Sequence, residues 1–179
     1  SEHPFNKLSP FAFSKDFLIP VPGMDNVFSH SVESIWQGLK VIDGNIDESL
    51  FKKKPKKKKG LVQGHKFEDK ILDIGEARKK IYIPSYTFYL DNYVPSEIIN
   101  NILDEQRAGK RIFLYDVENN GDLTKPEPLA HAAVLATYFN LKIFASDIEP
   151  INDVEEKLFA ILDNPFCLLY TSDAADEED

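Results

Sequence analysis

The sequence predicts a mainly helical α+β fold with a few short strands, built as a single domain over residues 1–166. Apolar residues recur at helical spacing in several stretches, while runs of β-prone residues are few and short. A chain of 179 residues, 42% hydrophobic and 12% aromatic, is long and apolar enough to bury one core. This composition excludes a chain that is disordered throughout.

The first part of the chain is expected to be irregular and to lead into the first helix. Prolines and a glycine between aromatic residues favour short extended pieces and turns over residues 6–26. Ser29 or Ser31 is the expected N-cap of a helix that ends before Gly44. Its apolar stripe consists of Val32, Ile35, Trp36 and Leu39.

Three more helices are predicted in the middle of the chain. Apolar spacing indicates them over residues 67–77, 86–90 and 96–109, and Pro84 separates the first two. Ser96 opens the last of these helices and Gly109 closes it, as expected for a capped helix.

Beyond residue 110 the pattern is mixed. Residues 111–115 are β-prone and predict a strand with Asp116 at its carboxyl end, followed by a loop over 118–128. Pro128 suits the first turn of a helix through Tyr138, and residues 141–144 suggest a second strand.

The last thirteen residues, CLLYTSDAADEED, resemble a translated sequencing adapter. We expect residues 167–179 to be vector-derived and the natural chain to be cut near Phe166. The tail holds the only cysteine, Cys167, and five acidic residues, so without it the net charge moves from −9 to −4. A thiol nucleophile, a disulfide and a Cys-ligated metal are therefore excluded.

Seven lysines lie in one block, Lys52 to Lys59, interrupted only by Pro55, on an otherwise acidic chain. Like-charge repulsion and the proline favour a solvated loop. Two alternatives stay open: a nuclear-localisation-like signal, and a contact to nucleic acid or phosphate.

A polar face on the first predicted helix is the main candidate site. Glu33, Gln37 and Lys40 stand at i, i+4 and i+7, so they share one face beside the apolar stripe. The alternative is an ordinary solvated face with one i, i+4 contact.

The segments LSPF (8–11) and SVESIWQGLK (31–40) resemble the start of the NADAR (YbiA-like) domain. Glu33, Gln37 and Lys40 fall on that family's most characteristic positions, whereas Pro10 replaces its Asn and Ser34 its His. The same helix motif, with GHK, GEARKKIYIPSY and PLAHA further on, also resembles an uncharacterised family of bacterial and phage proteins.

The NADAR resemblance implies a compact, mostly helical N-glycosidase that acts on a ribosylated pyrimidine or on ADP-ribosylated guanine. Cleaving a C–N glycosidic bond builds positive charge on the sugar, which a carboxylate stabilises. Glu33 is the candidate for that role. Trp36 is a candidate platform for the base, although a stripe position is commonly core, and Lys40 or the lysines Lys58 and Lys59 are candidates to hold a phosphate.

Further candidates lie later in the chain. Asp116 and Asp122 are candidate second carboxylates, with turn formation as the alternative for both. Gly64 and His65 follow the lysines, and a glycine permits close approach of the backbone to a ligand. His131 is a candidate pocket residue or a core histidine. No histidine spacing supports a metal, and no cofactor is expected.

These observations leave three hypotheses: an N-glycosidase-like hydrolase, a noncatalytic nucleotide- or nucleic-acid-binding module, and a phage-type accessory interaction protein. The expected ligand is a ribosylated or phosphorylated small molecule, and nucleic acid binding through Lys52 to Lys59 stays open. No apolar run of membrane-spanning length and no secretory pattern is present, so we expect a cytoplasmic protein without membrane contact, or a nuclear one if the lysines act as a signal.

Overall fold

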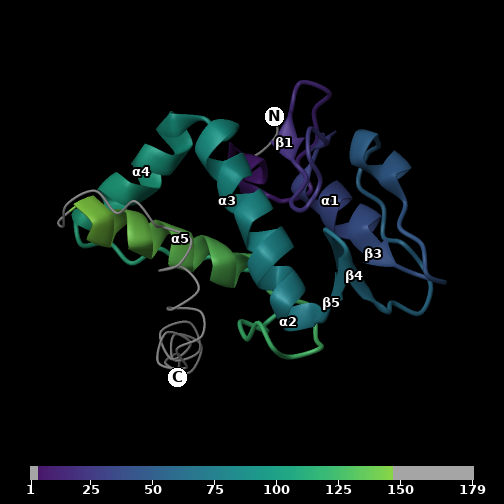
Figure 1. Ribbon diagram of the computed structural model, residues 1–179. Helices are drawn as coiled ribbons and strands as arrows, with labels where there is room; N and C mark the ends of the chain where they lie inside the picture. Colours follow the sequence, from purple (N-terminus) through teal and green to yellow (C-terminus); the bar gives the residue numbers. More distant parts are fainter. Residues whose placement is uncertain (1–3, 147–179) are drawn as a thin grey trace. The chain divides into compact units, whose positions relative to one another are not determined.

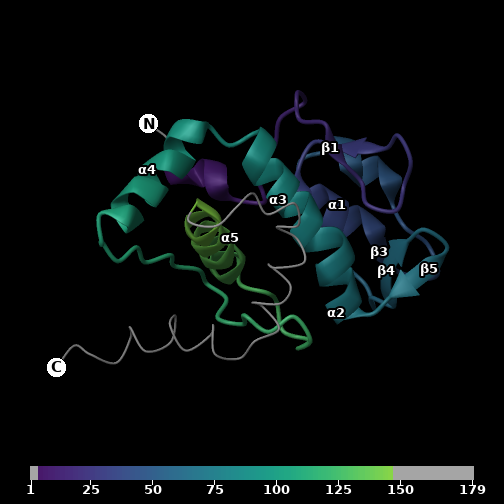
Figure 2. The same cartoon turned by 60° about the vertical axis from the view of Figure 1, so that its left-hand side comes forward.

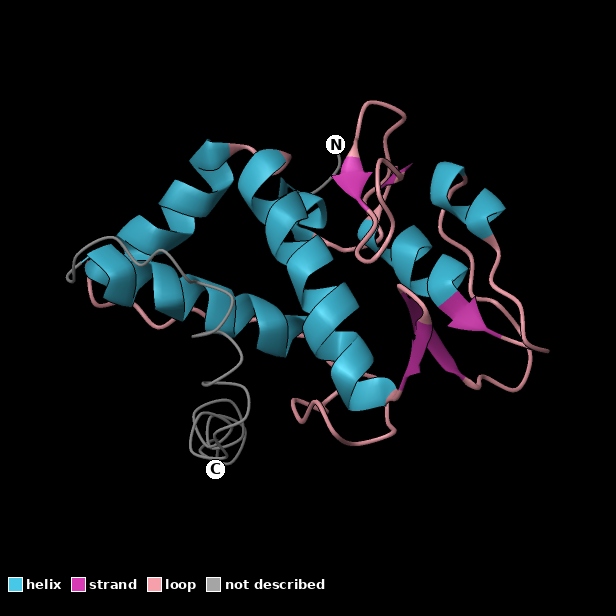
Figure 3. Cartoon of the chain, viewed as in Figure 1, coloured by secondary structure: helices cyan, strands magenta, loops and turns pink. Residues whose placement is uncertain are grey.

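A computed structural model of the chain describes residues 4–146 (Figure 1). It confirms a mainly helical α+β fold, in which a few short antiparallel strands form two small sheets (Figure 3). The residues group into two compact units, Ser1–Ile98 and Ile99–Asp179. Each unit is described by itself.

The first unit contains both sheets. After the short helix η1 (Pro4–Leu8), β1 (Ile19–Pro20) pairs with β2 (Phe28–Ser29). The second sheet has the order β3-β4-β5, all antiparallel. Its strands are β3 (Lys40–Val41), β4 (Gly64–Phe67) and β5 (Lys70–Leu72), with Lys40 opposite His65 and His65 opposite Leu72.

The helices of the first unit surround α1 (Val32–Leu39). The 3-10 helix η2 (Glu48–Lys52) packs against it. A longer helical run consists of α2 (Ile74–Ala77), the π-helical turn η3 (Arg78–Tyr82) and α3 (Ile83–Asn92). Helix α1 contacts both α3 and strand β4, and the start of the helical run, α2, contacts β4 and β5 (Figures 1 and 2).

The core of the first unit forms because α1 and α3 bury apolar faces against each other. Ile35 and Leu39 of α1 are fully buried, as are Ile83 and Tyr86 of the α3 run. Phe51 of η2 fills the space beside Gly38. Burial of such side chains supplies most of the free energy that favours folding.

The described part of the second unit is helical. Helix α4 (Ser96–Arg107) buries Ile99, Ile102 and Leu103, and α5 (His131–Ser146) buries Val134, Tyr138 and Phe139 among others. Gln106 of α4 hydrogen-bonds Asn140 of α5. Residues 108–130 connect the two helices without a regular element.

Three sequence-based predictions of secondary structure are wrong. Residues 64–72 form the hairpin β4-β5, so no helix spans 67–77. Glu68 takes a positive φ of 51° at the turn of this hairpin. The prediction failed because apolar spacing alone does not distinguish a short helix from a hairpin. Residues 111–115 are not a strand, because a strand needs a hydrogen-bonded neighbour and none of residues 4–146 pairs with them. Residues 141–144 continue α5.

A fourth prediction, that Pro84 separates two helices, is also wrong: Pro84 lies in the first turn of α3, and the helical run over 74–92 passes through it. The other predicted helices are confirmed with shifted ends, and residues 118–128 are a loop as expected. The predicted tail over 167–179 and the predicted domain end at 166 lie outside the described residues. Among the helices that are described, none has the length and apolar character that crossing a bilayer requires.

Candidate functional site

Helix α1 carries the candidate site, and its start is set by the sequence. Ser31 is the N-cap: its side chain accepts a hydrogen bond from the Ser34 N–H at 3.0 Å. The apolar side chains Ile35 and Leu39 then fix which face enters the core. The polar residues Glu33 and Gln37 are nevertheless buried as well, at 4% and 2% exposure.

A series of hydrogen bonds joins Glu33 and Gln37 of α1 to Lys40, the C-cap residue with which β3 begins. Gln37 Nε2 donates to Glu33 Oε1 at 2.6 Å, and Lys40 Nζ donates to Gln37 Oε1 at 2.9 Å. The main-chain N–H of Lys58 donates to the same Gln37 Oε1 at 2.9 Å. The three predicted side chains do lie together, although Lys40 follows the end of the helix, and Glu33 and Gln37 are not solvated.

This series of hydrogen bonds fixes the orientation of the Gln37 amide. Two donors, the Lys40 ammonium and the Lys58 N–H, converge on one end of the amide, so that end must be its oxygen. The other end is therefore the NH₂ group, which faces Glu33. Glu33 Oε2 has no hydrogen-bond partner among the described residues, so one carboxyl oxygen is held and the other is available.

Burial governs the proton affinity of this face. It raises the pKa of Glu33, an effect that the Gln37 hydrogen bond and the charges of Lys40 and Lys57 oppose only in part. Burial also lowers the pKa of Lys40, with Glu33 opposing and Lys57 and Lys58 adding to the shift. Both groups are thus closer to proton exchange near neutral pH than free side chains are.

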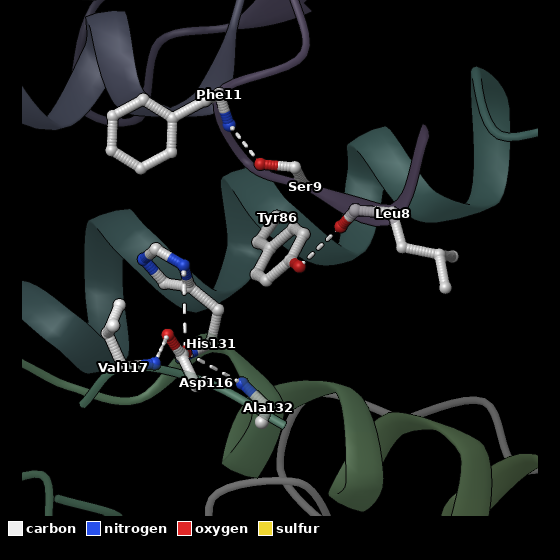
Figure 4. Close-up of polar contacts among 8 residues, drawn as sticks. All are labelled: Leu8, Ser9, Phe11, Tyr86, Asp116, Val117, His131 and Ala132. Carbon is white, nitrogen blue, oxygen red and sulfur yellow. Dashed lines mark hydrogen bonds and ion pairs between the residues drawn. The ribbon is translucent and has the colours of Figure 1, made fainter. Parts of the chain in front are cut away.

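The LSPF segment is fastened beside the start of α1. The Pro10 carbonyl accepts a hydrogen bond from the Glu33 N–H at 3.0 Å. Tyr86 Oη of α3 donates to the Leu8 carbonyl at 2.6 Å, and Ser9 Oγ accepts from the Phe11 N–H (Figure 4). The two segments that carry the family resemblance are therefore in direct contact at Glu33.

An aromatic pair adjoins the polar chain. The Trp36 ring stacks on the His65 ring with centroids 3.7 Å apart and planes at 28°, and Tyr82 meets Trp36 edge-on at 5.4 Å. Trp36 is half-buried rather than fully inside the core. Its position therefore suits a platform with a supported inner face.

His65 is buried at 2% exposure, and its Nδ1 and Nε2 have no hydrogen-bond partner within residues 4–146. Burial, with the charges of Lys40 and Arg78, lowers the pKa of His65 to about 3. The imidazole is therefore neutral at physiological pH. Buried polar atoms without partners are rare in proteins, so His65 is a candidate contact for a bound molecule.

Gly64 approaches the protein's own backbone. A Cβ at this position would lie 2.5 Å from the Leu72 carbonyl oxygen, and φ is +145°. The glycine is thus needed for the tight pairing of β4 with β5. This pairing places His65 opposite Lys40.

The lysine block is an exposed segment with one anchored residue. Lys54 to Lys59 have no regular structure, and all but Lys58 are exposed among these lysines, as expected for a solvated loop. Lys58 is half-buried: besides its N–H bond to Gln37, its Nζ donates to the Lys40 carbonyl at 2.8 Å. Lys59 is exposed.

The sequence analysis missed two residues near the aromatic pair. Arg78 is buried at 2% exposure and its charge acts on His65, and Tyr82 contacts Trp36. Both lie on the π-helical turn η3, a rare geometry that is frequent at functional sites. Arg78 and Tyr82 are four positions apart, next to the apolar residues Ala77 and Ile81, and this helical spacing could have indicated that both face the core.

Asp116, Asp122 and His131 belong to the second unit. Asp116 Oδ2 accepts from the N–H groups of His131 and Ala132 at 2.6 and 3.2 Å and so caps α5 (Figure 4). Asp122 Oδ1 accepts from the N–H and hydroxyl of Thr124, a typical turn. Their catalytic or binding roles stay predictions.

The arrangement in the first unit offers a desolvated carboxyl, a neighbouring ammonium, a half-exposed indole and a neutral imidazole. Together these groups suit a small polar ligand with an aromatic part. In residues 4–146, no group of three or more His, Cys, Asp or Glu side chains is placed to hold a metal ion.

Comparison with known proteins gives a family but no activity. A family model described as "Family of unknown function (DUF6939)" matches residues 1–135, which include every residue of the site on α1, the lysine segment and β4. No curated protein matches the chain, and no solved structure does. Since the match covers most of its length, the chain belongs to this family of unknown function, DUF6939.

Proposed function

We propose that the protein is an N-glycosidase-like hydrolase that acts on a ribosylated nucleobase, a nucleotide or an ADP-ribose compound, with Glu33 as its central carboxyl. One observation carries the proposal: Glu33 is buried, one of its oxygens is held by Gln37, and the other has no partner among the described residues. A carboxyl without a function is seldom kept in such a place, because burial of its charge is costly.

The chemistry required is the replacement of a C–N bond by a C–O bond. As the base leaves C1 of the ribose, positive charge grows on the sugar, and the ionised Glu33 stabilises it. Water supplies the oxygen and its proton passes to Glu33 Oε2. The departing base takes up a proton from solvent, and Glu33 returns its proton to solvent afterwards, so that the sum is one water added across the bond. The raised pKa of Glu33 favours the proton-accepting step, because a base works best when its pKa lies near the working pH.

The remaining groups bind the substrate in this proposal. The half-exposed Trp36 stacks on the base, and Lys40 with Lys58 and Lys59 attracts a phosphate. His65 offers the donor and acceptor of a neutral imidazole. Asp116, Asp122 and His131 are proposed as further carboxylate and pocket residues. Such substrates belong to the cell interior, so the proposed location is cytoplasmic.

The test is release of free base. Purified protein is screened against nucleosides, nucleotides and ADP-ribosylated guanine, and Glu33→Gln is compared with Glu48→Gln, an exposed glutamate of η2. Glu33→Gln keeps the oxygen that accepts from Gln37, so we expect a normal fold and at least about a hundredfold loss of activity, as for loss of an acid–base group. Equal release by Glu33→Gln and Glu48→Gln would refute the role of Glu33.

A second candidate function is noncatalytic binding of a nucleotide or nucleic acid. The specific observation is the exposure of six lysines between Lys52 and Lys59. Replacing the seven lysines by serine should weaken binding of a labelled oligonucleotide and flatten the dependence of log Kd on log salt. An unchanged salt slope in this variant would exclude the lysines as the contact.

A further inference from the structure

We propose that the exposed lysines of the lysine segment (residues 52–59) form a polyanion-binding site that is coupled to Glu33 through Lys58 and Gln37. The inference concerns the site of the proposed function, but its test needs no substrate, so either can fail without the other.

The segment is fastened to α1 at two points. Ser34 Oγ donates to the Lys53 carbonyl at 2.9 Å, and the Lys58 N–H donates to Gln37 Oε1 at 2.9 Å. Lys58 Nζ also donates to the Lys40 carbonyl at 2.8 Å. The residues between the anchors have no regular structure, and Lys54, Lys56 and Lys57 are exposed.

Within residues 4–146, none of the exposed lysines Lys54, Lys56, Lys57 and Lys59 forms an ion pair with a carboxylate. Lysines this close repel one another, and a bound anion relieves that repulsion. The ligand class that fits is a flexible chain of several anionic groups, such as a polyphosphate, a polysulfate or a nucleic-acid backbone.

The hydrogen bond between Lys58 and Gln37 also transmits the effect of anion binding to Glu33. Two hydrogen bonds connect the segment to the carboxyl, Lys58 N–H to Gln37 and Gln37 to Glu33, and they hold Lys57 where its charge acts on Glu33. The other charge acting on Glu33 is Lys40, while Arg78 of η3 acts on His65 of β4, in the neighbouring aromatic pair. An anion on Lys57 removes part of the field that favours ionised Glu33.

The experiment uses sucrose octasulfate, whose charge is constant over the pH range needed. Calorimetry measures its binding, and carbon NMR follows the pH titration of the Glu33 carboxyl with and without it. In the wild-type protein we expect binding and an upward shift of the Glu33 pKa. Failure to bind, or binding without a change in the Glu33 titration, would overturn the proposal.

Variants separate the binding site from its coupling. Replacing Lys56, Lys57 and Lys59 by glutamine should weaken binding at least about tenfold, since each lysine releases about one counterion. Lys58→Pro removes the anchoring N–H, so binding should persist while the shift of the Glu33 pKa shrinks; Lys58→Met keeps the N–H and should retain the shift.

If the Glu33 pKa in Lys58→Pro shifts as much as in the wild type when the anion binds, coupling through the Lys58 N–H is refuted. If Lys58→Pro does not fold, Gln37→Met carries the same test, because at nearly constant volume it removes the two hydrogen bonds that join Lys58 to Glu33, together with the one from Lys40. Circular dichroism and thermal melting of each variant check the fold.

Discussion

At the scale of single residues, Glu33 combines a helix position that the sequence indicates with a burial that it does not. The i, i+4, i+7 spacing with Gln37 and Lys40 follows from helical geometry. The same spacing fits a solvated face equally well. Only the contacts with Pro10 and Lys58, residues distant in the sequence, show that the face is closed off.

The burial of Glu33 predicts how stability depends on pH. Because the folded protein holds the Glu33 proton more tightly than the unfolded chain does, the free energy of unfolding contributed by Glu33 falls as pH rises above 4.5 toward the raised pKa. Glu33→Gln removes this loss. In urea melts from pH 4 to 8, the free energy of unfolding of Glu33→Gln should increase relative to that of the wild type as pH rises. A constant difference between the two proteins across that range would contradict a raised pKa.

His65 predicts the opposite pH dependence. Its folded pKa of about 3 lies below the ordinary 6.5, so the unfolded chain binds the proton more readily and stability is lost as pH falls from 6.5 toward 3. His65→Phe keeps a ring on Trp36 and removes two unpaired nitrogens. The variant should be about 1–3 kcal/mol more stable at pH 7 and should lose this acid dependence in urea melts.

A gain in stability with a loss of ligand binding in His65→Phe would be typical of a residue kept for function. A less stable His65→Phe variant, with an unaltered acid dependence, would instead mean that the ring nitrogens are satisfied in solution.

At the scale of elements, the packing of η2 on α1 positions the start of the lysine segment. Gly38 makes this contact possible, because a Cβ there would lie 2.3 Å from Phe51 Cε1. Phe51 is buried at 1% exposure and its backbone holds His30 and Ser29. The side chain has little room to move aside.

Gly38→Ala should therefore destabilise the protein by about 1–3 kcal/mol, although alanine favours a helix over glycine. Phe51→Leu is the matched partner: in the double variant the alanine has space, so the two losses should not add. Chemical denaturation of the four proteins measures the coupling. Strictly additive losses would show that Gly38 and Phe51 do not compete for the same volume.

The elements also show where local pattern fails. Residues 67–77 contain apolar residues at helical spacing, yet the chain turns at Glu68 and pairs β4 with β5. Residues 111–115 are β-prone, yet Phe113 and Tyr115 are exposed at 54% and 92%. In both places the outcome depends on a partner segment, which periodicity does not specify.

At the scale of the whole molecule, the exposed stretches without regular structure predict where a protease cuts the described part of the chain. Lys110 and Arg111 lie in an exposed stretch without regular structure. The lysine segment is exposed too, but Lys58 is anchored and Pro55 protects the bond after Lys54.

Limited trypsin digestion should therefore cut after Lys110 or Arg111 before it cuts within Lys56 to Lys59, and mass spectrometry of early fragments identifies the sites. Lys58→Pro, which frees the segment, should bring the two cleavages closer in rate. First cuts inside α3 or α4 would contradict the described fold.

The sequence by itself determined the helical class, the start of α1 to within the choice of Ser29 or Ser31, the proximity of Glu33, Gln37 and Lys40, and the exposed lysine segment, because periodicity, capping and charge repulsion act between near neighbours. Tertiary structure alone decided that Glu33 and Gln37 are buried, that Trp36 stacks on His65, and that Lys58 holds Gln37. These are contacts between residues about 20 to 30 positions apart, and their free energy depends on which surfaces the folded chain removes from water.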